Sequence, residues 1–245
     1  EDLGLTMVAD GLGGHPAGDI ASQMAVQEVA EYMRDLDTEP TLPDVGQPAP
    51  PRFTVAALGQ AVRHANRAIH FAGRNIPACG GMGTTFAGLL IVRGFAFFAH
   101  VGDSRIYRAR AGELVRLTDD HSMAAEYLRV HGASADPMIL KQHESTLTRC
   151  LGAWPDVQVT LQGEPCAPGD VYLLCSDGLW GTLEHEALER LVVGATDLAE
   201  AAERLVEEAN AAGGPDNITA LLVRPLGGST PPASGEKERD EVDAS

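Results

Sequence analysis

Four short predicted strands follow one another almost without interruption, and they constrain the fold more than any other feature of the chain. They cover residues 84–92, 95–101, 104–109 and 113–117. The turns between them have only two or three residues. Connections this short join antiparallel neighbours, because a parallel crossover needs a dozen residues or more. The segments therefore predict antiparallel β-structure in the middle of the chain.

Segments with helical periodicity lie on both sides of these strands. The clearest begins at Val55, where apolar residues recur every three or four positions as far as Ile69. Further helices are predicted over 17–35, 184–193 and 197–212. This order of elements predicts an α+β fold in which helices cover antiparallel sheets.

The rest of the chain divides into shorter pieces. Additional strands are predicted over 3–10, 147–151, 156–162, 170–176 and 217–225. Five prolines make 37–51 a loop, and the polar segment 118–146 is predicted to be a small helical insertion. We expect one domain over 1–226 and a disordered acidic tail over 227–245, which lacks apolar periodicity.

The composition narrows the class of protein. The chain has 245 residues and a formal net charge of −17, which argues against a nucleic-acid-binding surface. The longest apolar run is interrupted by Arg93 and Gly94, so we expect no membrane span. The four cysteines lack CxxC or metal-site spacing and are expected to be reduced thiols. With no signal peptide in view, we expect a cytoplasmic protein.

Three aspartates stand at the ends of predicted strands, beside turn glycines. They are Asp10 in MVADGLGG, Asp177 in LLCSDGLWG and Asp216 in GGPDNITALLV. Each alone is typical of a simple turn. If the strand ends converge, the three carboxylates repel one another and need cations between them. Oxygen-preferring ions such as Mg²⁺ or Mn²⁺ suit these ligands, and the Gly11 carbonyl can join them because no Cβ obstructs it.

Six motifs, in order, resemble the bacterial metal-dependent protein phosphatases, the type 2C serine/threonine phosphatases. They are VADGLGGHPAGDIAS, GMGTTFAGLLI, AHVGDSRIYRARAGELVRLTDDHS, LTRCLG, LLCSDGLWG and GGPDNITALLV. The resemblance covers about residues 3–225. It implies two packed antiparallel β-sheets flanked by helices, an α-β-β-α sandwich with metals in a cleft at one end.

The resemblance also implies roles for individual residues. Asp10 would bridge two Mn²⁺ or Mg²⁺ ions, and the Gly11 carbonyl would bind the second. Asp177 and Asp216 would hold the first ion. Asp103 would bind a third ion together with Asp177, although the sequence by itself favours a hairpin turn between strands 95–101 and 104–109 at this position. A water between the metals would attack phosphorus directly.

His15 resembles the histidine proposed in this family as the general acid for the leaving oxygen. Its alternative interpretation is a loop histidine that caps the following helix. The segment 118–146, which contains His121 and Ser122, corresponds to the flap beside the active site. Thr84 and Thr85 are predicted to orient groups around the metal ligands.

The chain departs from the family pattern at its start. Family members carry an upstream strand with a phosphate-binding arginine and an acidic ligand for the second metal. Asp2 cannot replace that ligand, because a strand over 3–10 places it about 25 Å from Asp10. We therefore expect this strand to be absent, the second metal to bind weakly, and one sheet edge to be unpaired.

Taken together, these features predict a monomeric phosphatase that acts on phosphoserine and phosphothreonine in proteins and reverses a serine/threonine protein kinase. The alternative is a weakly catalytic or non-catalytic relative that binds a regulatory partner. Two other classes are excluded by spacing. An aspartyl-phosphate hydrolase needs a second aspartate where Leu12 stands, and GLGGHPAG lacks the third glycine of a dinucleotide-binding loop.

Overall fold

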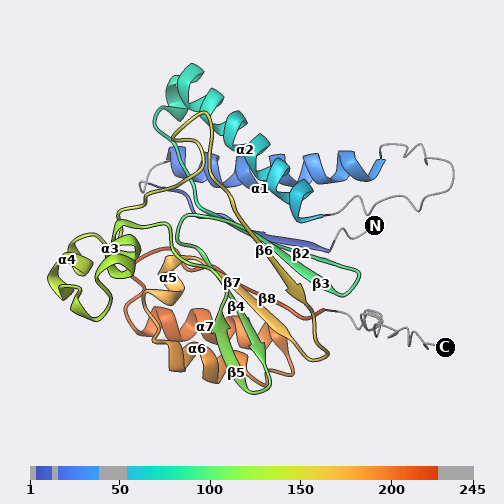
Figure 1. Cartoon of the computed structure of the whole chain (residues 1–245), viewed down its shortest axis with the longest axis vertical. Helices are drawn as coiled ribbons and strands as arrows, with labels where there is room; N and C mark the ends of the chain where they lie inside the picture. The colour runs from blue at the N-terminus through green and yellow to red at the C-terminus, as the bar shows by residue number, and fades with distance from the viewer. Residues whose placement is uncertain (1–3, 13–15, 39–53, 226–245) are drawn as a thin grey trace, which may run out of the picture.

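The computed structural model describes residues 4–12, 16–38 and 54–225 (Figure 1). Two four-stranded antiparallel sheets pack face to face, and a pair of long helices covers each outer face. This is the α-β-β-α sandwich that the family resemblance implied. The first helix pair lies at the top of Figure 1 and the second at the bottom.

The first sheet has the strand order β1-β2-β3-β6. Its strands are β1 (Leu5–Val8), β2 (Phe86–Val92), β3 (Phe95–Val101) and β6 (Thr160–Pro165). Helices α1 (Pro16–Thr38) and α2 (Val55–Asn75) cover it. Thr54 caps α2, because its hydroxyl accepts a hydrogen bond from the Ala57 N–H at 3.1 Å.

The second sheet has the order β5-β4-β7-β8. Its strands are β4 (Arg105–Arg110), β5 (Glu113–Arg116), β7 (Val171–Cys175) and β8 (Ala220–Val223). Helices α6 (His185–Val192) and α7 (Leu198–Ala211) cover its outer face, and the short α5 (Asp177–Trp180) follows β7 directly. None of the described helices is long and apolar enough to cross a membrane.

The core has three layers of buried side chains. One lies between the first sheet and α1–α2, and another between the second sheet and α6–α7. The third lies between the sheets and includes Val8, Phe98, Ile106 and Tyr172. Alternation along each strand sends one set of side chains to the helices and the other set to the opposite sheet.

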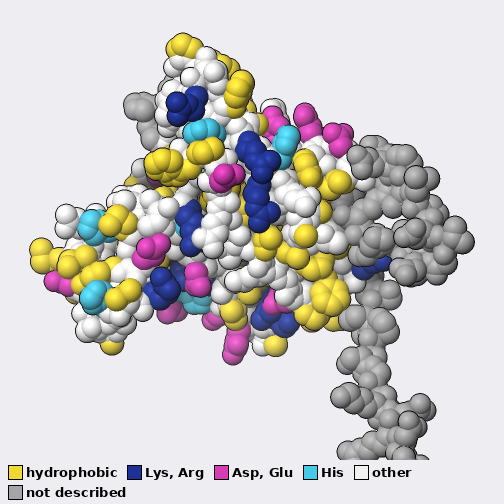
Figure 2. Space-filling model, turned by 45° about the horizontal axis from the view of Figure 1, so that its top comes forward, with side chains coloured by type: hydrophobic (Ala, Val, Ile, Leu, Met, Phe, Trp, Pro, Cys, Tyr) yellow, Lys and Arg dark blue, Asp and Glu magenta, His cyan; other side chains and the backbone are white. Residues whose placement is uncertain are grey.

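The insertion 118–146 contains two short helices, α3 (Met123–His131) and α4 (Pro137–Gln142), joined by a 3₁₀ turn at Gly132–Ser134. Neither α3 nor α4 buries a single residue. Val130 and Met138 are 73% and 81% exposed, and hydrophobic side chains gather over this part of the surface in Figure 2. The two helices of the insertion therefore stand away from the core, whereas its first residues, such as His121, are buried.

Strand register brings several strand ends to one edge of the sandwich. In the first sheet, β1 and β3 both run antiparallel to β2, so they end on the same side. In the second sheet, Arg105 at the start of β4 pairs with Cys175 at the end of β7. Cys175 in turn pairs with Ala220 at the start of β8. The segments after β1, β3 and β7 and before β8 therefore meet.

Three predictions about strands need correction. Residues 147–151 form no strand, because only the isolated bridges of Leu147 to Ser122 and Leu151 to Thr84 hold them. The strand expected over 156–162 lies later, as β6. The strands 95–101 and 104–109 are not a hairpin, because β3 and β4 belong to different sheets. The chain crosses between sheets at residues 102–104.

Other predictions fall partly or wholly outside the described residues. These are the structure of most of the loop 37–51, the tail 227–245, His15 and Asp2. The strand β1 lies at the edge of the first sheet. All four cysteines are free thiols: Cys79 and Cys175 are buried, and Cys150 and Cys166 are partly exposed.

Candidate active site

Four aspartates gather at the edge where the strand ends meet. Asp10 follows β1, Asp103 lies in the crossing from β3 to β4, Asp177 opens α5, and Asp216 precedes β8. Asp10 and Asp177 share a hydrogen bond, and Asp216 and Asp103 lie near enough to repel the Asp10 carboxylate. Both sheets thus contribute carboxylates to one cluster.

Two threonines at the start of the β2 segment hold the backbone of Asp10. The Asp10 N–H donates to the Thr85 hydroxyl at 3.0 Å, and the Thr84 hydroxyl donates to the Asp10 carbonyl at 2.8 Å. Thr85 also shares a 2.6 Å hydrogen bond with Ser104, next to Asp103. These contacts join the Asp10 segment to the crossing between the sheets, in keeping with the orienting role predicted for the threonines.

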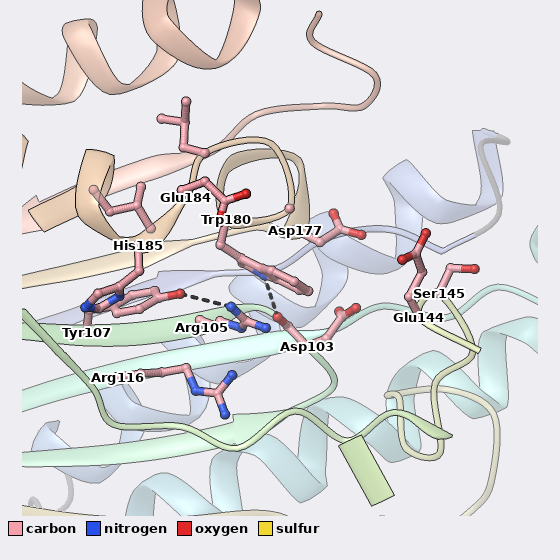
Figure 3. A pocket seen from close by; sticks show the side chains of 13 residues that line it. Asp103, Arg105, Tyr107, Arg116, Glu144, Ser145, Asp177, Trp180, Glu184 and His185 are labelled. Carbon is pink, nitrogen blue, oxygen red and sulfur yellow. Dashed lines mark hydrogen bonds between the residues drawn. The ribbon is translucent and has the colours of Figure 1, made fainter. Parts of the chain in front are cut away.

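Asp103 is held from the opposite side by an aromatic ring. The Trp180 indole N–H donates to the Asp103 carbonyl at 2.9 Å (Figure 3). The Arg105 guanidinium lies 3.3 Å from the centre of the Trp180 ring, a cation–π contact. Arg105 also donates to the Tyr107 hydroxyl at 3.1 Å. The Asp103 side chain is consequently almost buried, with the residue 7% exposed.

Ser176 joins the Asp177 turn to the segment that carries Asp216. Its hydroxyl donates to the Asn217 carbonyl at 3.1 Å and accepts from the Thr219 N–H at 3.0 Å. Gly178 packs directly against the same segment, so that a Cβ there would overlap the Asn217 carbonyl oxygen. The Asp-Gly dipeptide is therefore required by close packing as well as by the turn.

Gly11 is required for a similar reason. A Cβ on Gly11 would overlap the carbonyl group of Gly18 in α1. Its neighbour Leu12 donates its N–H to the Gly83 carbonyl at 2.9 Å, and Gly11 itself bridges to Thr84. The loop after Asp10 thus lies tightly between α1 and the start of the β2 segment.

Burial and mutual repulsion of the carboxyl groups dominate the electrostatics of the cluster, and the positive charge of Arg105 offsets them only in part at Asp103. Burial, followed by repulsion from Asp177, raises the pKa of both Asp10 and Asp103 to about 7. Burial also raises the pKa of Asp177, and the hydrogen bond that it shares with Asp10 acts in the opposite direction on this group. Asp216 is exposed, and its carboxylate accepts a 2.8 Å hydrogen bond from the Asn217 N–H.

The chemistry of the donors fits a hard divalent cation. All are oxygen atoms, and Asp177 Oδ1 is buried without a hydrogen-bond partner. As they lie, no three His, Cys, Asp or Glu side chains within 4–12, 16–38 and 54–225 are arranged to hold a metal ion. A cation that displaced the shared proton of Asp10 and Asp177 would satisfy the unpaired oxygen and relieve the repulsion.

Two histidines with tilted rings in contact lie beside the crossing between the sheets, and sequence reasoning missed the first of them. His100 is 1% exposed on β3, and its ring lies 4.5 Å from that of His121, centre to centre. His121 forms two hydrogen bonds with Gly102, the residue before Asp103. The ring Nδ1 of His121 accepts from the Gly102 N–H, and the backbone N–H of His121 donates to the Gly102 carbonyl. Burial lowers the pKa of His100 to about 3 and that of His121 to about 4.

Strand alternation from Phe98 was the available signal for His100, because it sends residue 100 towards the opposite sheet. The remaining described histidines have no metal-ligand spacing and differ in exposure. His64, His131 and His185 are exposed, whereas His70 and His143 are partly buried, and His70 contacts the Gly152 carbonyl at 2.9 Å.

Comparisons with known proteins identify the family. The sequence profile of the family described as "Protein phosphatase 2C" matches residues 1–222. The serine/threonine phosphatase stp of Listeria monocytogenes is 32% identical over 219 residues, which are 89% of this chain and 83% of that protein. The protein phosphatase PhpP of Streptococcus pneumoniae is 35% identical over 226 residues, 90% of this chain and 86% of that protein.

The solved structures agree. The crystal structure of the catalytic domain of the serine threonine protein phosphatase PstP, in complex with two manganese ions, is similar with a TM-score of 0.73 and 35% identity. The match covers 89% of this chain and 86% of that one. The chain therefore belongs to the protein phosphatase 2C family. The expected fold and enzyme class, a serine/threonine phosphatase, are confirmed.

Proposed function

We propose that the aspartate cluster is the active site at which this phosphatase hydrolyses phosphoserine and phosphothreonine with the help of divalent metal ions. The observation that supports this most directly is the meeting of four aspartates from both sheets at one edge, with Asp177 Oδ1 buried and unpaired. Such a cluster is costly unless cations occupy it. The manganese ions of the related PstP catalytic domain favour Mn²⁺, with Mg²⁺ as the alternative.

In this proposal Asp10 and the Gly11 carbonyl would serve as ligands of the divalent ions, together with Asp177 and Asp216. Asp103 with Asp177 would hold a further ion. When bound, such ions supply positive charge for the phosphate ester and lower the pKa of water. The protein itself orients the ligands: Thr84 and Thr85 hold Asp10, and Ser176 connects Asp177 to the Asp216 segment.

We further propose that His15 donates a proton to the serine or threonine oxygen as it leaves. His15→Asn should then lower kcat for a phosphothreonine peptide by roughly 10²-fold or more, because an alkoxide leaves poorly without a proton. Hydrolysis of p-nitrophenyl phosphate should fall far less, because nitrophenolate leaves unprotonated. Equal losses with both substrates would contradict this role.

The physiological setting is also a proposal. The substrates are phosphoproteins, among them a serine/threonine protein kinase whose action the enzyme reverses. The enzyme works as a monomer in the cytoplasm.

The decisive experiment is manganese-dependent hydrolysis of a phosphothreonine peptide, with and without chelator. Asp177→Asn keeps the shape of the side chain and removes its charge, so turnover should fall by more than about 100-fold. Asp156→Asn, at an exposed position outside the cluster, should leave turnover unchanged. Activity that survives both chelator and Asp177→Asn would disprove the assignment. A parent protein that binds the peptide without hydrolysing it would favour the non-catalytic alternative.

A further inference from the structure

A cavity of about 660 Å³ opens beside the aspartate cluster and shares Asp103 and Asp177 with it. Figure 3 shows Glu184 and His185 on one side of this cavity and Glu144 on the other, with the two aspartates between them. Clefts of roughly 300–1,000 Å³ are typical of ligand sites. The cavity therefore has room for residues that flank a phosphorylated side chain.

The two arginines that line the cavity are already paired with carboxylates. Arg105 donates to both oxygens of Asp120, at 2.9 and 2.7 Å. Arg116 lies 3.5 Å from Asp119 and 3.7 Å from Asp120. Arg105 is therefore fully paired, and Arg116 faces the same carboxylates at longer range, so both guanidinium groups are already directed at carboxylates of the protein itself.

The carboxylates of two glutamates at the cavity, in contrast, have no hydrogen-bond or ion-pair partner among the described residues. Glu144 lies just after α4 in the insertion, and Glu184 immediately precedes α6. Glu184 occupies the N-cap position of α6, yet its carboxylate forms no capping hydrogen bond. Both side chains are exposed, and neither forms an ion pair within the described parts of the chain.

Apolar side chains line the cavity between these charges. Leu183 and Leu188 contribute aliphatic surface, and the Tyr107 ring lies beside the His185 ring. A long cationic side chain suits such a surface, because its methylene stem packs on apolar groups while its charged end reaches a carboxylate. An acidic side chain would instead meet two unpaired glutamates.

We propose that this cavity is a specificity subsite that binds an arginine or lysine side chain of the phosphoprotein, close to the phosphorylated residue. Glu144 and Glu184 recognise the positive charge. The proposal rests on the proposed function, because it takes the neighbouring aspartate cluster as the catalytic centre. It also assigns the insertion a part in substrate choice, through Glu144.

The test uses the whole chain with manganese and a phosphothreonine peptide flanked by alanines. One flanking position at a time, up to three on each side, carries arginine, its neutral isostere citrulline, or glutamate. At one or more positions, arginine should lower KM about three- to fivefold relative to citrulline, the size expected of a partly exposed ion pair. Glutamate at the same position should raise KM. The preference should weaken as salt is added.

Variants then identify the residues responsible. Glu144→Gln and Glu184→Gln should each reduce the arginine-to-citrulline ratio, and the double substitution should bring it to about one. Glu186→Gln is the matched control, because Glu186 lies two residues further along at an exposed position that does not line the cavity. It should keep the ratio of the parent.

Different outcomes test the proposed subsite and the proposed function separately. Hydrolysis of all peptides without an arginine preference would overturn the subsite alone, as would a preference that survives the double substitution. Failure of the parent to hydrolyse any peptide or p-nitrophenyl phosphate with manganese would overturn the proposed function, and the subsite with it.

Discussion

The pKa of Asp103 depends on the place of this residue in the fold. It stands where the chain passes from one sheet to the other, under the Trp180 ring, and it is almost buried. Burial is the main cause that raises its pKa to about 7, and repulsion from Asp177 and Asp120 adds to it. Without a cation, the folded protein therefore disfavours the ionised form of this carboxyl group.

This leads to a pH-dependent prediction for the metal-free protein. The folded pKa of Asp103 lies above its unfolded value of 3.8, so ionisation lowers the free energy of unfolding as pH rises from about 4 to 7. Asp103→Asn cannot ionise. In chelator, the variant should gain stability relative to the parent across this range and hold the gain above pH 7. Urea denaturation at pH 5 and pH 7.5 measures the difference in the free energy of unfolding between the variant and the parent. The same difference at both pH values would contradict this prediction.

Gly178 gives a second prediction at this scale. A methyl group there would overlap the Asn217 carbonyl, so Gly178→Ala must push the Asp177 and Asp216 segments apart. We expect a loss of about 1–3 kcal/mol in the free energy of unfolding, together with weaker manganese binding. Gly80→Ala is the matched control, because its Cβ would lie 3.4 Å from the Pro77 carbonyl, an ordinary contact. Equal effects of the two substitutions would refute the packing argument.

Among the elements, α3 differs from the long helices in what stabilises it. It buries no residue, so tertiary packing contributes little to its stability, and the hydrogen bonds that cap its ends matter more. The Ser122 hydroxyl accepts from the Ala125 N–H at 3.2 Å and caps the helix. His121, the residue before, anchors the insertion to Gly102.

Ser122→Ala should therefore loosen α3 locally. Loss of the cap costs about 1 kcal/mol, which should speed hydrogen exchange of the α3 amides several-fold while leaving global unfolding nearly unchanged. Thr54→Ala removes the equivalent cap from α2, which packs in the core. That loss should appear instead in the global urea midpoint. The same response from both helices would be evidence against a locally unfolding insertion.

For the whole molecule, the important fact is that the aspartate cluster draws on both sheets. Asp10 belongs to the first sheet, whereas Asp177 and Asp216 border the second. Bringing these carboxylates together costs electrostatic free energy, and the packing between the two sheets has to offset it. Metal ions bound at the cluster should offset that cost and stabilise the complete sandwich.

Manganese should accordingly raise the melting temperature. At a free concentration about 100 times Kd, one bound ion adds about 2.7 kcal/mol, or roughly 5–10 °C for a domain of this size. Asp177→Asn should remove most of the shift, and Asp156→Asn should retain it. Differential scanning fluorimetry with manganese and with chelator provides the measurement. A melting temperature insensitive to manganese would contradict a metal site between the sheets.

Much of this protein could be predicted from local pattern. Apolar periodicity marked α2, α6 and α7 to within a few residues, because a helix that covers a sheet must bury one face. The aspartates at 10, 177 and 216 stood out because each interrupts or precedes an apolar strand. Short turns correctly indicated the hairpins β2–β3 and β4–β5.

Only the tertiary structure decided how these pieces combine. The short link at residues 102–104 looks like any hairpin turn. Whether the next strand returns beside the last or joins another sheet depends on packing far away in the sequence. Residues 147–151 have strand-like composition without a continuous partner. The ring contact of His100 with His121, the Arg105–Trp180 contact and the cavity beside Asp177 likewise depend on segments that meet only in the folded chain. Residue types and short-range spacing determine elements, whereas long-range register and packing determine the site.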